Sequence, residues 1–103
     1  MLRPIGAALL MVAVPFAAAA GEIYGTANPQ AKDLEVKIQC GDQSQNTFAD
    51  QRGSYRLYIP RQGECKLSVR RGSASWSEPL TIYSSERPAR YDFLIKGNRL
   101  ERQ

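Results

Sequence analysis

The 103-residue chain has no histidine, only two cysteines, and no apolar run long enough to cross a bilayer as a helix. Without histidine neither a Ser-His-Asp triad nor a Cys-His pair can form, and two cysteines alone cannot complete a structural zinc site. The ten carboxylates are scattered singly, which gives paired acid–base catalysis no visible basis. These absences predict a non-catalytic protein without metal or cofactor. A Ser–Lys pair, or a small hydrolase without a recognisable motif, stays open as an alternative.

The first 20 residues have the layout of a secretory signal peptide. Arg3 supplies a positive start, residues 5–14 are apolar, and small alanines at 18–20 precede a cleavage site at Gly21. A membrane anchor or a buried helix is the alternative, but this apolar run is about half the ~20 residues that a bilayer requires. The sequence therefore predicts a signal peptide over 1–20 and a periplasmic or secreted product.

Cys40 and Cys65 form an even pair in a small, exported chain, which predicts a disulfide. The chain has no C-x-x-C motif and no histidine to activate a thiolate, so a redox or nucleophilic role is disfavoured. Closing this loop of 26 residues is expected to stabilise the fold by about 3.5 kcal/mol. Only about a third of the residues after position 20 are apolar, so the bridge would supply a large share of the stability.

Alternation of apolar and polar residues predicts strands with one buried face. The alternation is clear at 34–40, 55–59, 65–69 and 91–95, and weaker at 22–26, 44–49 and 76–83. With turn residues between these runs, the pattern predicts a seven-stranded antiparallel β-sandwich over 21–96. Both cysteines and Tyr55 fall on inward positions, and the Tyr55 hydroxyl needs a polar partner there. Residues 97–103 are predicted to be a flexible, polar tail.

The central motif of the chain resembles that of a known family. Residues Gly21-Glu22-Ile23-Tyr24-Gly25 read as G-x-(V/I)-x-G, and Thr47 to Leu57 read as T-x-x-D-x-x-G-x-Y-x-L. Within the second string, Asp50 and Gly53 suit a tight turn. With Val36-Lys37-Ile38 and Leu67-Ser68-Val69, these motifs make the chain similar to carboxypeptidase regulatory-like domains. The resemblance implies a Greek-key, transthyretin-like (prealbumin-like) sandwich that serves as an accessory binding or structural module without peptidase chemistry.

Basic residues concentrate in the stretch 52–71, which has six Lys and Arg against one acid. Arg56 and Tyr58 share the outward parity of one predicted strand, and Lys66 and Arg70 share that of the next. If these strands pair as a hairpin, they form one basic face suited to an acidic protein, an acidic glycan or an anionic lipid surface. The alternative is a solvated face whose charges discourage edge pairing. Export argues against a nucleic-acid partner.

Surface aromatics and one loop complete the predicted site. Tyr24, Tyr58, Trp76 and Tyr83 could stack on sugars or anchor a protein partner. Trp76 shares the parity of Leu80 and is expected in the core or at its rim, and Tyr58 and Tyr83 are the better surface candidates. The loop Pro60-Arg61-Gln62-Gly63 could insert into a foreign enzyme. The candidate binding residues are therefore Arg56, Tyr58, Arg61, Lys66, Arg70 and Tyr83. The leading interpretation is an exported binding or structural module, and an exported enzyme inhibitor that acts through this loop is the alternative.

Overall fold

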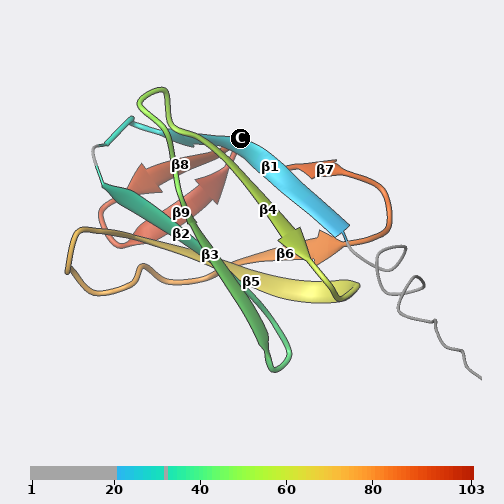
Figure 1. The fold of residues 1–103 in the computed structure, drawn as a ribbon. Coiled ribbons are helices and arrows are strands. Elements are labelled where there is room, and N and C mark those ends of the chain that lie inside the picture. Colours follow the sequence, from blue (N-terminus) through green and yellow to red (C-terminus); the bar gives the residue numbers. More distant parts are fainter. Residues whose placement is uncertain (1–20, 32) are drawn as a thin grey trace, which may run out of the picture.

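The computed structural model describes residues 21–31 and 33–103, so the predicted signal peptide lies outside the described residues. The described residues form nine β-strands in two layered sheets (Figure 1), which confirms the predicted all-β sandwich. Among the described residues there is no helix long and apolar enough to cross a membrane.

The five-stranded sheet has β1 (Gly21–Asn28) at its centre. The remaining strands are β4 (Ser54–Ile59), β7 (Ala89–Arg90), β8 (Phe93–Lys96) and β9 (Arg99–Arg102). β1 pairs antiparallel with β4 but parallel with both β7 and β8, so this sheet is mixed rather than wholly antiparallel.

The four-stranded sheet is wholly antiparallel, in the order β3-β2-β5-β6. Its strands are β2 (Leu34–Cys40), β3 (Gln43–Phe48), β5 (Gly63–Arg71) and β6 (Leu80–Ser84). The hairpin of β2 and β3 reaches past the neighbouring strands (Figure 1).

The core lies between the two sheets and follows the predicted alternation. Every second residue of β2 is buried, from Leu34 to Cys40, and β4 buries Tyr55, Leu57 and Ile59 in the same way. The Tyr55 and Phe93 rings meet with their centroids 5.7 Å apart. The predicted inward position of Tyr55 is confirmed, and its hydroxyl donates a 2.7 Å hydrogen bond to the Tyr91 carbonyl.

The predicted disulfide is present. Cys40 and Cys65 face each other across β2 and β5, and both side chains are buried in the core. The closed loop contains β3 and β4, and therefore the crossing of the chain from one sheet to the other. A disulfide of this kind is typical of proteins in an oxidising, extracytoplasmic compartment.

The strand count corrects the sequence prediction of seven. β7 has two residues, too few to show a period, and β9 occupies part of the segment predicted to be a tail. Arg99–Arg102 pairs with β8 at the sheet edge, where only Leu100 is half-buried and the remaining side chains face solvent. A short edge strand made mostly of exposed polar residues cannot be told from a polar tail by its sequence.

The strand predicted at 76–83 begins only at Leu80. Pro79 has no N–H to donate, and the segment before it bonds to β5 only through the Ala74 N–H, in a turn onto the Arg71 carbonyl, and through Ser77. There the Ser77 N–H donates to the Val69 carbonyl and the Ser77 hydroxyl accepts from the Val69 N–H. These bonds place the 72–79 segment beside the four-stranded sheet without extending β6.

The strand predicted at 91–95 begins only at Phe93, as β8. Residues 91 and 92 form a break between β7 and β8. The Tyr91 N–H donates to the Tyr24 carbonyl, and the next bond to β1 is made by the Asp92 carboxylate, which accepts from the Thr26 N–H at 2.9 Å. Gly25 faces this break, and a Cβ there would collide with the Tyr91 carbonyl oxygen. The break frees the Tyr91 hydroxyl to reach β6, where it accepts from the Tyr83 N–H at 3.0 Å.

The loop after β3 forms the tight turn predicted for Asp50 and Gly53. The Asp50 carboxylate accepts hydrogen bonds from the N–H groups of Arg52 and Ser54, and its carbonyl accepts from the Gly53 N–H. The Ala27 N–H donates to the Gly53 carbonyl, which anchors the turn on β1. The chain thereby passes from the four-stranded sheet to the five-stranded sheet, so β3 and β4 do not pair.

Candidate anion-binding groove

The single basic face predicted from the sequence is wrong, because its residues lie on two different sheets. Arg56 and Tyr58 belong to β4 in the five-stranded sheet, whereas Lys66 and Arg70 belong to β5 in the four-stranded sheet. The outward sides of the two sheets face away from each other. β4 and β5 follow one another closely in the sequence, but the short loop between them crosses the sandwich instead of closing a hairpin.

Each basic residue of the predicted site is also paired with a carboxylate. Arg56 Nε lies 2.8 Å from Glu22 Oε2, Arg61 Nη1 3.0 Å from Asp42 Oδ1, Lys66 Nζ 3.3 Å from Glu64 Oε2, and Arg70 Nε 2.8 Å from Glu35 Oε1. Three of these four acids lie outside the stretch 52–71. The charge counted along that stretch therefore overstates the charge of the surface.

The 60–63 loop leans on the neighbouring turn rather than projecting freely. Arg61 lies over Gly41 and Asp42, and its guanidinium would be 2.9 Å from a Cβ at Gly41. This contact ties the loop to the β2–β3 hairpin, so the structure offers no specific support for the inhibitor alternative.

The aromatic residues divide as the sequence predicts only in part. Tyr58 and Tyr83 are exposed, with 58% and 60% of their surface accessible. Trp76 is half-buried, but it lies outside the core, where Lys37 Nζ and the Arg70 guanidinium each lie 4.4 Å from its ring. These two cation–π contacts attach the 72–79 segment to the outward side of the four-stranded sheet.

A second aromatic residue with two cations lies on the outward side of the five-stranded sheet. Tyr24 of β1 is the direct cross-strand partner of Arg56 on one side and of Arg90 on the other. The two guanidinium carbons are 5.9 and 6.0 Å from the Tyr24 ring centroid. Strand register alone therefore places one arginine on each side of Tyr24, because directly opposed residues share a face of the sheet.

These three residues line a hollow of about 430 Å³, which we call the arginine–tyrosine groove. Its other lining residues are Gly25, Thr26, Thr47, Phe48, Asp50, Ser54 and Tyr55. The hydroxyl groups of Thr26, Thr47 and Ser54 and the exposed Phe48 ring thus accompany the two arginines, whereas the Tyr55 hydroxyl is bonded to the Tyr91 carbonyl. The groove combines charged donors, neutral hydrogen-bonding groups, one apolar ring and the Asp50 carboxylate, which already accepts from two backbone N–H groups.

Both arginines of the groove retain donors for a ligand. Arg56 approaches Glu22 through Nε, and Arg90 donates to both Asp92 oxygens through Nε. A guanidinium has five N–H groups, four of them on its terminal nitrogens. The side chains of Arg56 and Arg90 are 62% and 58% exposed, so these terminal nitrogens are accessible. The carboxylates on Nε orient the guanidinium groups without blocking the fork that binds carboxylates or phosphates.

Asp92 anchors one side of the groove and has a shifted pKa. Its partial burial favours the protonated acid, but the hydrogen bonds from Arg90 and from the N–H and hydroxyl of Thr26 outweigh burial and lower the pKa of Asp92. On the other sheet, hydrogen bonds from Asn46 and then Arg70 lower the pKa of Glu35. Both carboxylates therefore stay ionised below the usual range of such groups.

We expect the Asp92→Asn variant to be less stable than wild type near pH 7 and to lose that disadvantage in acid. A carboxylate whose folded pKa is lowered stabilises the fold above its unfolded pKa, about 4, and that stabilisation disappears as the pH falls through the folded pKa. Urea unfolding midpoints from about pH 7 down to about pH 2.5 provide the measurement. A difference that stays constant across this range would show that ionised Asp92 does not stabilise the fold.

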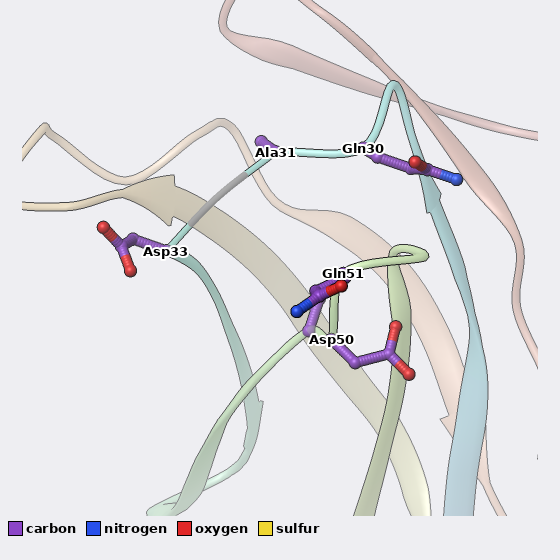
Figure 2. A pocket seen from close by; sticks show the side chains of 6 residues that line it. Gln30, Ala31, Asp33, Asp50 and Gln51 are labelled. Atoms are coloured by element: carbon purple, nitrogen blue, oxygen red, sulfur yellow. The ribbon is translucent and has the colours of Figure 1, made fainter.

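A larger hollow, of about 610 Å³, is lined by Gln30, Ala31, Asp33, Ala49, Asp50 and Gln51. Figure 2 shows that the carboxylates of Asp33 and Asp50 point away from each other there, and Asp50 is already bonded to Arg52 and Ser54. Among the described lining residues no pair of charged side chains converges, so this hollow is not assigned as a site. In the part of the chain that the structure describes, no three His, Cys, Asp or Glu side chains gather in a way that could hold a metal ion.

No protein-family model matches the chain, and a search of curated proteins finds no match either. Assignment of the groove therefore depends on its own geometry.

Sequence reasoning selected Arg56 and considered Tyr24 among the aromatics, but it placed neither Tyr24 nor Arg90 beside Arg56. The parity of Tyr24 in the 22–26 run was available as a signal, because Tyr24 alternates with the buried Ile23 and Gly25. Arg90 had no comparable signal, since it lies in a strand of two residues. Only the parallel pairing of β7 with β1 brings it beside Tyr24.

Proposed function

We propose that the protein is an exported, non-catalytic binding module that holds an anionic group of an envelope component in the arginine–tyrosine groove. The observation that carries this proposal is the pair of guanidinium groups on either side of Tyr24, each bonded to a carboxylate through Nε. Such a pair can hold one carboxylate or phosphate by charge-assisted hydrogen bonds from both sides. The hydroxyl groups of Thr26, Thr47 and Ser54 can bind the neutral part of the ligand.

Two further observations support an extracytoplasmic role. The first 20 residues read as a signal peptide, and the buried Cys40–Cys65 disulfide fits an oxidising compartment. The resemblance to carboxypeptidase regulatory-like domains supports an accessory module rather than an enzyme. We accordingly infer a periplasmic or secreted protein whose partner is an acidic glycan, an anionic lipid or an acidic protein surface.

The Arg56→Gln/Arg90→Gln double variant tests the groove. Two probes separate the sources of the anion: soluble polygalacturonate for carboxylated glycans, and phosphatidylglycerol vesicles for anionic lipid. Binding of the probe that the wild type recognises is expected to weaken about tenfold at low salt, and less at high salt, because salt screens exposed charges. Titration calorimetry and vesicle co-sedimentation measure these changes.

Lys66→Gln/Arg71→Gln is the matched control, because it removes the same charge from β5 on the other sheet. We expect this control to bind within about twofold of wild type. Equal weakening in both double variants would mean that net charge alone attracts the probe. If wild type binds neither probe, the groove does not recognise an anionic group of these classes and the proposal is wrong.

A further inference from the structure

β3 is an open sheet edge without the usual protection against pairing. It forms one edge of the four-stranded sheet and consists of Gln, Ser, Gln, Asn, Thr and Phe, with no charged residue and no proline. All of its residues are exposed except Thr47, which is half-buried. Its pairing with β2 runs without a bulge from Gln43 to Phe48. Edge strands normally carry a lysine, a proline, a bulge or a cover, because an unprotected edge is a template for another strand.

The backbone groups of β3 that face the open edge can be identified from the hairpin. Its two-residue turn, Gly41–Asp42, closes on the pair Cys40–Gln43, so alternation along the ladder directs the N–H and C=O groups of Ser44, Asn46 and Phe48 away from β2. Among the described residues no backbone group bonds to them. The edge therefore offers three donors and three acceptors in a regular row.

The opposite edge of the same sheet, formed by β6, is capped at one of its outward-facing residues. Tyr83 of β6 turns its N–H and C=O outward, and the Tyr91 hydroxyl bonds to both, at 3.0 and 3.3 Å. The same sheet thus has one edge capped at Tyr83 and one edge that is bare. The bare edge belongs to the hairpin that reaches past the neighbouring strands, so another strand can approach it (Figure 1).

We propose that β3 pairs antiparallel with β3 of a second copy, about a two-fold axis that passes beside Asn46. In this register Asn46 faces Asn46 of the second copy, and Ser44 faces Phe48 of the second copy. Each outward N–H and C=O of the three edge residues then finds a partner. The two four-stranded sheets become one continuous sheet, a closed and self-complementary interface.

The chemistry of β3 favours its own copy over a charged peptide. β3 has no charge to attract an acidic or a basic strand, and self-pairing brings no like charges directly opposite each other. Phe48 is 64% exposed and would cover the small Ser44 of the second copy. The backbone of Asn46 is already held in the extended form that pairing requires by the ladder with β2, and its side-chain amide donates to Glu35 Oε2 at 2.9 Å.

Cysteine cross-linking tests both the partner and the register. Opposed, hydrogen-bonded residues have Cα atoms about 5.5 Å apart, which a disulfide can span, so Asn46→Cys should form a covalent dimer on mild oxidation. Ser44→Cys is the matched control, because the two Ser44 residues would be about 13 Å apart in this register. We expect the Asn46→Cys variant to cross-link at least about tenfold faster than Ser44→Cys at equal concentration.

Light scattering on the unmodified protein supplies an independent test. Its mass should rise toward two chains with concentration, Asn46→Lys should remain a single chain, and an equimolar mixture of Asn46→Lys and Asn46→Glu should regain the dimer. A cooperative thermal transition in each variant, at a concentration where wild type is a single chain, would show that these variants fold. A single-chain mass up to about 1 mM, or equal cross-linking of the two cysteine variants, would overturn the proposal.

Discussion

Replacing Tyr55 by alanine is expected to lower the free energy of unfolding by about 3–5 kcal/mol, the range for truncation of a buried aromatic side chain. Tyr55 is 4% exposed, packs against the Phe93 ring and bonds to the Tyr91 carbonyl. It thereby connects β4 with the segment that joins β7 and β8. A domain of this size has little stability beyond that amount, so much of the variant should be unfolded at room temperature. Circular dichroism during urea unfolding provides the measurement.

Tyr55→Phe separates the hydroxyl from the ring and should cost about 1–1.5 kcal/mol near neutral pH. Burial, and then the nearby negative charge of Asp92, raise the pKa of Tyr55 above the usual range of tyrosine. A raised folded pKa means that the stabilisation is complete below the unfolded pKa, about 10, and is lost as the pH rises beyond it. The cost of Tyr55→Phe should therefore shrink above about pH 10. If Tyr55→Ala and Tyr55→Phe prove equally stable, the ring does not pack as described.

The second large effect is expected from removing the disulfide. The Cys40→Ala/Cys65→Ala variant should lose about 3.5 kcal/mol, because the unfolded chain gains the entropy of a loop that is otherwise closed. The loop includes β3, the turn at Asp50 and β4. The residues that gain freedom in the unfolded variant are therefore those that cross between the two sheets in the folded protein. Both cysteines are replaced together, since a single free thiol would be left in the core and could form mixed disulfides.

Reduction gives the same change without mutation. Wild-type protein unfolded in urea with a reductant should match the double alanine variant to within about 1 kcal/mol, apart from the two sulfur atoms lost from the core. The double variant itself should not respond to the reductant. A wild-type midpoint that is the same with and without reductant would show that the bridge contributes nothing to stability.

Local alternation made the strands predictable, because each strand of a sandwich has one buried face. The run predicted at 34–40 is β2, and the run at 55–59 differs from β4 by one residue. The disulfide followed from the same parity, since Cys40 and Cys65 were both placed inward. β9 was missed because an edge strand that is exposed on both faces has no alternation to detect.

Which strands pair could not be predicted in the same way. The predicted basic face assumed that β4 and β5 pair because they are close in the sequence, but β4 pairs with β1 and β5 with β2 and β6. The choice depends on contacts between distant residues, such as the bond from the Ala27 N–H to the Gly53 carbonyl. For the same reason the charges of Arg56 and Arg70 could not be judged from the stretch that contains them, since Glu22 and Glu35 come from earlier strands.

The parallel pairing of β1 also determines when this protein can finish folding. A chain that is made and exported from its N-terminus presents β1 first among the described strands, and β4 becomes available to β1 before β7 and β8 do. The other side of β1 waits for β7 and β8, and the bond from Thr26 to Asp92 joins residues 66 positions apart. Contacts between residues so far apart in the sequence slow folding, because a long loop must close before they form. The nascent chain therefore carries a second bare edge, on β1, that disappears only when the last quarter of the protein has been made.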